Sequence, residues 1–357
     1  MAEQQALRRL RHVAAAVVPV PCVATAEKAK LVELEGESIA RLSAVKVALL
    51  RIGERGVPLG SPEEVDRLFQ SRGLVPVRVR SVDDLPADAE VVVTTGAPVG
   101  SDVLQKMPKL KLVAVAFTGT DHIDVAACKA RRVAVAHVPG YSTDATAELA
   151  IGLVISHLRR LQQCHQLIKD GQWSCPPQED LRSKTVGIIG VGKIGLRLAE
   201  LFNAFHVRGL IGYSTNQDPA FAALGGVYVD TLAALFLDAD IVCVCVPLTE
   251  TSEGMVSDSL MGLLRSDSLL VNVSRGGVID ELALAKHLGR GSFRAALDVF
   301  SNEPLPKTNP LRQVPPEQLL MTPHVGYQSQ ASLAKRLDVT VKNVLAHLAG
   351  QATNIVA

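Results

Sequence analysis

The chain has 357 residues, 48% of them hydrophobic and 4% aromatic, and its 37 basic and 36 acidic side chains leave a formal net charge of +1. This length accommodates two domains, and the balanced charge argues against nucleic acid or an anionic membrane surface as a partner. The sequence also shows no apolar run long enough to cross a bilayer, so we expect no membrane partner.

The N-terminal 44 residues read as an extension ahead of the first strand. Arg8, Arg9 and Arg11 precede an alanine and valine run, which faintly resembles a transit peptide and leaves organelle targeting as an alternative. The six cysteines are scattered, with neither zinc spacing nor a disulfide pattern. That usage predicts a reducing, cytoplasmic setting.

From residue 45 the chain alternates strands with helices. Ser61 is predicted to cap a helix that has Pro62 in its first turn and Glu64 closing a capping box. A single long helix is predicted over residues 144–169, long enough to bridge two domains. Before it, short apolar runs predict strands at residues 45–50, 75–79, 90–94, 110–117 and 133–138.

A glycine fingerprint follows that helix. The apolar run at 185–189 predicts a buried strand, and residues 193–206 have helical spacing. Between them, Gly190, Gly192 and Gly195 form G-x-G-x-x-G, which in a strand–turn–helix context is typical of dinucleotide binding. The helix N-terminus would then offer its free N–H groups to the pyrophosphate.

The rest of the chain predicts a second doubly wound domain. A helix over residues 329–349 follows its last strand and is predicted to return to the first domain. The fold class is therefore α/β, with two Rossmann-like doubly wound parallel sheets and a cleft between them. We expect a substrate domain of residues 45–144 plus 325–357 and a dinucleotide-binding domain of residues 145–324. The later strands of the second domain are predicted at 208–213, 241–246, 268–273, 294–299 and 319–322.

Several polar segments stand at the predicted strand ends. They are residues 190–195, 272–277, 298–304 and 322–326 in the second domain, and 118–124, 138–144 and 147–148 in the first. In this order the segments resemble those of the D-isomer-specific 2-hydroxyacid dehydrogenases. The resemblance covers the chain from about Val45 to its C-terminus, and its first-domain segments look most like the hydroxypyruvate and glyoxylate reductase branch.

The resemblance implies a catalytic set of Arg275, Glu303 and His324. A histidine suits the removal of a hydroxyl proton while hydride leaves the same carbon, and a neighbouring carboxylate orients its ring. Arginine presents a planar fork to a substrate carboxylate. Gly96, Ala97 and Gly119 are implied as further substrate-binding residues. At Gly96 and Ala97 the alternative is a plain glycine turn. Each catalytic residue, taken alone, could also have an ordinary structural role.

The resemblance also implies the coenzyme site. Asp298 would accept hydrogen bonds from the nicotinamide carboxamide, with bonding to nearby backbone as the alternative. Ser214 departs from the usual pattern, because the second strand of such units commonly ends in Asp or Glu. Its hydroxyl leaves room for a 2′-phosphate, which predicts NAD(P)(H) with a modest preference for NADP(H); the alternative is that Ser214 only caps the next turn. The remaining coenzyme residues are Lys193, Ile194, Thr215, Val246, Pro247, Thr251, Val273, Ser274 and Arg275.

We therefore expect an oxidoreductase that acts on a small 2-oxo or 2-hydroxy acid and, by resemblance, forms a homodimer. The other eight histidines show no ligand spacing, and no metal is expected. Two alternatives remain. The chain could be a phosphite-oxidising dehydrogenase or a dinucleotide-sensing corepressor, because both kinds of protein resemble this chain at the three catalytic positions.

Overall fold

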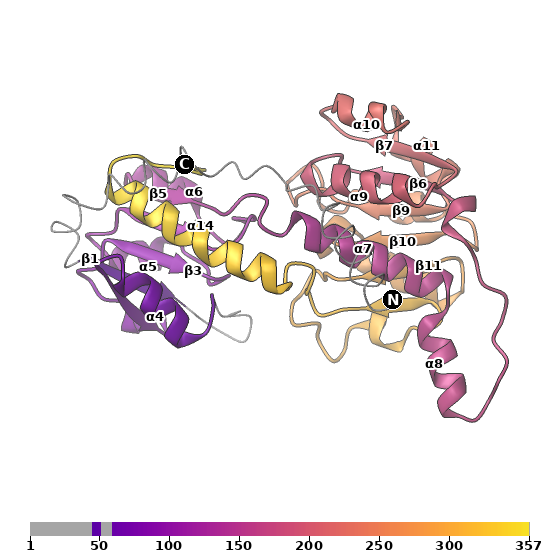
Figure 1. Ribbon diagram of the computed structural model, residues 1–357, viewed down its shortest axis with the longest axis horizontal. Coiled ribbons are helices and arrows are strands. Elements are labelled where there is room, and N and C mark those ends of the chain that lie inside the picture. The colour runs from indigo at the N-terminus through magenta and orange to yellow at the C-terminus, as the bar shows by residue number, and fades with distance from the viewer. Residues whose placement is uncertain (1–44, 51–58, 357) are drawn as a thin grey trace, which may run out of the picture.

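The computed structural model describes residues 45–50 and 59–356, so the N-terminal extension lies outside the described residues. Two lobes, each built on its own parallel sheet, are joined where the chain crosses between them (Figure 1). The predicted strands are confirmed to within about three residues at each end, and only the short β8 was missed. Within the described ranges, no helix is both long and apolar enough to cross a membrane.

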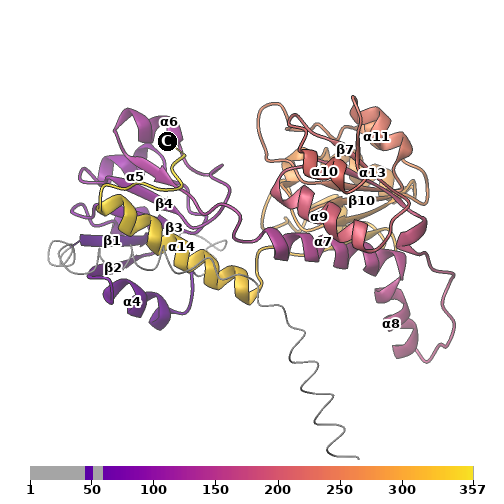
Figure 2. The same cartoon turned by 45° about the horizontal axis from the view of Figure 1, so that its top comes forward.

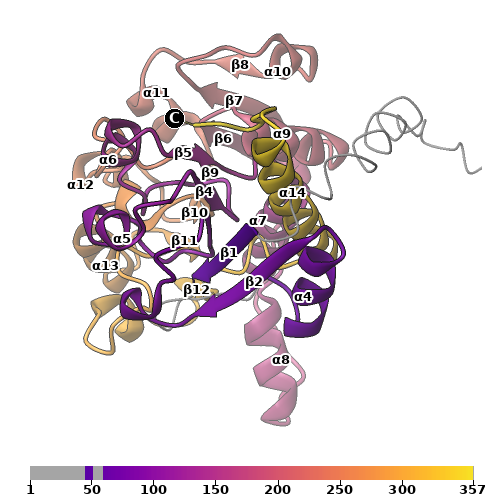
Figure 3. The same ribbon diagram turned by 90° about the vertical axis from the view of Figure 1, so that its left-hand side faces the viewer.

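The first lobe holds a five-stranded sheet in the order β2-β1-β3-β4-β5. Helices α4 and α14 cover one side of this sheet, and α5 and α6 cover the other (Figure 3). The cap of α4 is as predicted, with Ser61 Oγ accepting from the Glu64 N–H at 3.2 Å. The elements are β1 (Val45–Leu50), α4 (Pro62–Gln70), β2 (Leu74–Val79), β3 (Val91–Thr94), α5 (Ser101–Lys106), β4 (Leu112–Val115), α6 (Val125–Ala130), β5 (Ala134–Ala136) and α14 (Gln330–Leu348).

The second lobe holds a seven-stranded sheet in the order β12-β11-β10-β9-β6-β7-β8. Helices α7 and α9 pack on one face, and α11, α12 and α13 on the other. The elements are α7 (Thr143–Leu158), α8 (Leu161–Lys169), β6 (Thr185–Ile189), α9 (Lys193–Ala204), β7 (Gly209–Tyr213), α10 (Pro219–Ala223), β8 (Val227–Tyr228), α11 (Leu232–Asp238), β9 (Ile241–Val244), α12 (Asp258–Met261), β10 (Leu269–Asn272), α13 (Glu281–Gly289), β11 (Arg294–Leu297) and β12 (Leu319–Met321).

The single helix predicted over residues 144–169 is wrong, because the chain breaks into α7 and α8 at Arg160. That residue has the left-handed φ of 47°. The cause is burial, since α7 packs into the core of the second lobe whereas α8 buries none of its residues and projects away from the body (Figure 2). The sequence around the break has neither proline nor glycine to mark it.

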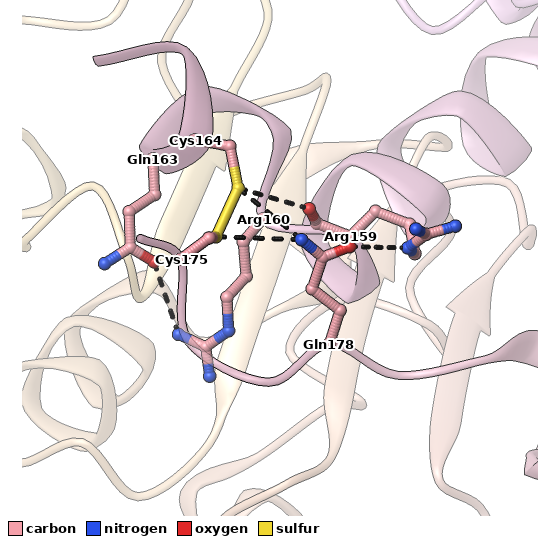
Figure 4. The surroundings of a disulfide bond; sticks show 6 residues. All are labelled: Arg159, Arg160, Gln163, Cys164, Cys175 and Gln178. Atoms are coloured by element: carbon pink, nitrogen blue, oxygen red, sulfur yellow. Dashed lines mark hydrogen bonds between the residues drawn. A yellow bond between two sulfur atoms is a disulfide. The ribbon is translucent and has the colours of Figure 1, made fainter. Parts of the chain in front are cut away.

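The expectation of no disulfide is also wrong, because Cys164 and Cys175 form one (Figure 4). The chain reverses at Gly171, whose φ is +74°, and this brings the two Cα atoms to 6.0 Å. The Gln178 amide lies 3.6 Å from both sulfur atoms and accepts from Arg159 Nε at 2.7 Å. Sequence separation alone could not show this reversal.

In each sheet the strand order reverses at one point, and ligands of open α/β sheets bind beside such points at the carboxyl ends of the strands. The reversal lies between β1 and β3 in the first lobe and between β6 and β9 in the second. Gly96 and Ala97 follow β3, and Gly190 follows β6. The two sets of predicted binding residues therefore stand where each sheet is built to receive a ligand.

Candidate active site

The glycine fingerprint occupies the turn from β6 to α9, and each glycine has a geometric reason. Gly190 has a φ of +89°, which favours glycine, and a Cβ on Gly195 would overlap the Gly190 carbonyl oxygen. Gly192 caps α9 and faces open space, so an anion could approach the free N–H groups there. Lys193 and Ile194 form the first turn of this helix. These residues fit the pyrophosphate of a dinucleotide.

The loop after β9 lies beside this turn. A Cβ built on Gly190 would come within 2.6 Å of Val246 Cγ1, so these two predicted coenzyme residues are neighbours. Ser252 Oγ fixes the loop by donating to the Pro247 carbonyl at 2.6 Å. Thr251 lies exposed on the same loop, with its hydroxyl 3.0 Å from that of Thr249.

Ser214 and Thr215 follow the end of β7. Ser214 is half-buried and Thr215 is exposed. The next helix, α10, has Asp218 as its N-cap, and the Asp218 carboxylate accepts from the Ala220 N–H at 2.9 Å. That cap is therefore supplied by Asp218 and not by Ser214.

Asp298 ends β11 and is only 1% exposed. Its carboxylate accepts from Thr322 Oγ1 at 2.6 Å and from the N–H groups of Val325 and Gly326, both at 2.8 Å. Burial raises the pKa of this carboxyl above its ordinary value, and the three hydrogen bonds oppose that rise. Two carboxylate oxygens offer about four acceptor positions, so one remains for a donor such as a carboxamide. The backbone bonding expected as the alternative is present, and it leaves this position open.

His324 and Glu303 form a hydrogen-bonded pair. His324 Nδ1 donates to Glu303 Oε2 at 2.8 Å, and Glu303 Oε1 accepts from the Phe300 N–H at 2.9 Å. His324 has a φ of 53°, unusual for a residue with a side chain, and its N–H donates to the Asp298 carbonyl at 2.8 Å. The pairing fixes the ring and leaves Nε2 as the nitrogen free to exchange a proton with a ligand.

Arg275 extends from a locked turn after β10. The Asn272 side chain accepts from Ser274 and donates to the Arg275 carbonyl at 2.9 Å, and Val273 is buried within the turn. A Cβ on Gly276 would overlap the backbone of Phe300. Glycine is therefore required for the Arg275 turn to lie against the segment that carries Glu303.

The Arg275 guanidinium reaches the first lobe. Its Nε donates to Asp121 Oδ2 at 2.9 Å and its Nη1 donates to the Ser274 carbonyl at 2.9 Å. A Cβ on Gly119 would overlap Nη2, so the guanidinium lies directly on the Gly119 backbone. Gly119 and Arg275, both predicted substrate residues, are thereby brought together across the two lobes.

Gly96 lies at one end of a row of aromatic rings. A Cβ on Gly96, whose φ is +94°, would be 3.7 Å from the Phe117 ring. The ring of Phe117 is 5.3 Å from that of Tyr327, which in turn lies 5.7 Å from His324 with an interplanar angle of 80°. The aromatic residues thus connect Gly96 with His324.

Two residues of this arrangement, Asp121 and Tyr327, are not among the site residues predicted from the sequence. Asp121 stood within the matched segment of residues 118–124, but an acidic side chain beside a predicted anion site gave no reason to assign it a role. Tyr327 directly follows the last matched segment, and no pattern in the sequence marks it as a site residue. Among the residues that the structure describes, no cluster of three or more histidine, cysteine or carboxylate side chains could hold a metal ion.

The chain is similar to known proteins over most of its length. Residues 151–326 match the family model described as the NAD binding domain of D-isomer specific 2-hydroxyacid dehydrogenases. The glyoxylate/hydroxypyruvate reductase B of Citrobacter koseri is 33% identical over 296 residues, which cover 81% of this chain and 90% of that protein.

Solved structures of similar fold include further reductases and dehydrogenases of 2-hydroxy acids. The NADPH-dependent glyoxylate/hydroxypyruvate reductase of Sinorhizobium meliloti, in complex with NADP and malonate, is 28% identical with a TM-score of 0.76, over 88% of this chain and 97% of that one. The D-lactate dehydrogenase of Aquifex aeolicus, complexed with NAD and lactic acid, is 27% identical with a TM-score of 0.77, over 85% of this chain and 96% of that one.

Proposed function

The chain belongs to the D-isomer specific 2-hydroxyacid dehydrogenase family, and on this premise we propose that it reduces a small 2-oxo acid such as glyoxylate or hydroxypyruvate. As a member of that family it is an oxidoreductase of CH–OH donors that uses NAD(P)(H). The observation that carries the proposal is the hydrogen bond of 2.8 Å between His324 and Glu303. The backbone of His324 is bonded to Asp298, the residue proposed to bind the coenzyme.

The proposed chemistry assigns one role to each residue. The bound coenzyme supplies a hydride to the carbonyl carbon of the substrate. His324, in its charged form, donates a proton through Nε2 to the carbonyl oxygen, which becomes the hydroxyl. Glu303 orients the ring by accepting a hydrogen bond from Nδ1. Arg275 binds the substrate carboxylate, together with the backbone of Gly119 and of Gly96 and Ala97.

We assign the coenzyme, together with Arg275, Glu303 and His324, to a domain of residues 145–324. Gly96, Ala97 and Gly119 belong to a substrate domain of residues 45–144 plus 325–357. In the first of these domains the fingerprint, the loop at Val246 and Asp298 follow β6, β9 and β11, at the carboxyl ends of the strands of one sheet. Thr146 Oγ1 donates to the Gly326 carbonyl at 3.3 Å, so the two chain crossings lie in contact. This contact supports a hinge at the crossings, about which the lobes would close over the two ligands.

We propose that NADP(H) is preferred modestly over NAD(H). Ser214 offers a hydroxyl where a carboxylate would repel a 2′-phosphate. The reductase of Sinorhizobium meliloti, which is named as NADPH-dependent, supports this direction. Ser214 and Thr215 supply no positive charge, which argues for a modest preference and against a strict one.

We also propose a homodimer that acts in the cytoplasm. Leu161 and Ile168 of α8, and Trp173 of the segment that returns from it, are 52%, 55% and 92% exposed. Apolar side chains gathered on a projecting arm are typical of a surface that a second copy covers. Light scattering that gives the mass of one chain, 38.0 kDa, would contradict the dimer.

The proposed activity is tested by absorbance at 340 nm with NADPH or NADH and a panel of glyoxylate, hydroxypyruvate and pyruvate. We expect glyoxylate or hydroxypyruvate to be reduced fastest. His324→Ala should lower kcat by roughly 10²–10⁴-fold while NADPH still binds. Phosphite oxidation in place of 2-oxo acid reduction, or coenzyme binding without any turnover, would contradict the proposal.

A further inference from the structure

We propose that Asp121 is a positioning residue for Arg275. Its carboxylate, which comes from the first lobe, holds the guanidinium so that the remaining donors face the substrate carboxylate. This inference rests on the proposed function, in which Arg275 binds the substrate. It adds a residue to which that function gave no role.

Two acceptors orient the guanidinium. Asp121 Oδ2 accepts from Nε at 2.9 Å, and the Ser274 carbonyl accepts from Nη1 at 2.9 Å. A guanidinium has five N–H donors, so these bonds leave one donor on Nη1 and both donors on Nη2. Nη2 lies against Gly119, where any side chain would overlap it. Both Nη2 donors therefore lie at the predicted substrate residue Gly119.

The Asp121 contact joins parts of the chain that are 154 residues apart and belong to different lobes. Without it, the Ser274 carbonyl would be the only hydrogen-bond acceptor for the Arg275 guanidinium among the residues that the structure describes. Fixing such a side chain before the substrate arrives removes an ordering cost from binding. We therefore expect Asp121 to act on substrate affinity more than on the rate of the chemical step.

Asp121 and Arg275 are 44% and 35% exposed, so the pair itself stabilises the fold little. A negative charge beside an anion site also opposes substrate binding. Positioning and repulsion predict opposite effects when Asp121 is removed, and this makes the inference testable.

The experiment compares the wild type with Asp121→Ala, Asp121→Asn and a matched control, Asp124→Ala. Asp124 lies in the same loop, but its carboxylate caps α6 by accepting from the Ala127 N–H at 2.8 Å. We would measure kcat and KM for glyoxylate, the Kd of NADPH, and the Kd of oxalate for the NADP-bound protein.

For Asp121→Ala we expect KM for glyoxylate and Kd for oxalate to rise about tenfold, with kcat changed less than about threefold and the Kd of NADPH unchanged. Asp121→Asn, which keeps an acceptor for Nε, should restore most of the affinity. Unchanged or tighter oxalate binding by Asp121→Ala would overturn the inference, as would an equal loss in Asp124→Ala.

The two proposals fail differently. If the wild type reduces no 2-oxo acid, the proposed function fails, and oxalate titration of the NADP-bound protein still decides the role of Asp121. If the wild type reduces glyoxylate and Asp121→Ala binds oxalate equally well, only the role of Asp121 fails.

Discussion

Replacing Asp298 by alanine should destabilise the second lobe as well as weaken coenzyme use. The carboxylate is 1% exposed and receives hydrogen bonds from the Thr322 hydroxyl and from the backbone N–H groups of Val325 and Gly326. Removing it orphans one buried and one part-buried backbone donor, at about 1–3 kcal/mol each. The hydroxyl can rotate to another acceptor, and water entering from the coenzyme side can satisfy part of the loss. We therefore expect Asp298→Ala to lower the free energy of unfolding by about 2–4 kcal/mol.

Two further variants grade the effect, and a third, at Asp180, serves as a control. Asp298→Asn keeps one acceptor oxygen but turns an amide N–H₂ toward a backbone donor, so its loss should be smaller than that of alanine. Thr322→Val removes one hydrogen bond and should cost about 1 kcal/mol. Asp180 is exposed and its side chain makes no cap hydrogen bond, so Asp180→Asn should stay within about 0.5 kcal/mol of the wild type.

The assay is urea unfolding followed by circular dichroism, with KM for NADPH measured on the folded variants. Because Asp298 also accepts the His324 N–H through its carbonyl, a shifted loop should lower kcat as well. If Asp298→Ala unfolds at the wild-type urea concentration, the carboxylate does not hold this loop and the reasoning is refuted. If stability falls but KM for NADPH does not rise, the contact to the carboxamide is refuted instead.

Four further predictions follow from other parts of the molecule. Ser214→Asp should shift the ratio of kcat/KM toward NADH by about 1–3 kcal/mol in transition-state free energy, and a wild type that ignores NADPH would contradict the argument. His157 Nε2 donates to the Ala295 carbonyl, and burial lowers the pKa of His157 to about 4, so the unfolded chain alone takes up this proton between pH 6.5 and about 4. Stability should therefore fall across that window by up to about 3 kcal/mol, and His157→Gln should flatten the fall; parallel curves would refute this. Reducing the Cys164–Cys175 disulfide, or Cys164→Ser, should speed tryptic cleavage after Lys169 without changing the Kd of NADPH, whereas equal cleavage rates would show that the bridge does not order the arm. Coenzyme and oxalate together should lower the radius of gyration by X-ray scattering, and an unchanged radius counts against closure at the hinge.

The strands and the glycine turn could be predicted because local patterns determine them. The run at 185–189 and the glycines that follow it have the spacing of one strand–turn–helix unit, and the structure has that unit at the same residues. The break at Arg160 could not be predicted, because it depends on which half of the helical pattern finds a core to pack against. The disulfide likewise depends on the reversal at Gly171, which separation in sequence does not encode.

The residues of the candidate site also include some that the sequence predicts and some that it does not. Order along the chain and resemblance were enough to select His324 and Glu303, which the structure brings to 2.8 Å. Asp121 could not be selected, because its partner lies 154 residues away in the other lobe. A contact between two lobes depends on how they are set against each other, and short sequence patterns carry little information about that.

The return of α14 to the first lobe has a consequence for how the chain folds as it is synthesised. Leu337, Val341 and Val344 of this helix are buried in one cluster with Val47 and Leu112 of the first sheet. The ribosome makes that sheet before the second lobe, yet one face of the sheet stays uncovered until α14, which follows the second lobe, has emerged. The second lobe is continuous in sequence and needs no such late segment. We therefore expect it to fold first, against the usual order from the N-terminus, while the first lobe exposes apolar surface that chaperones can bind.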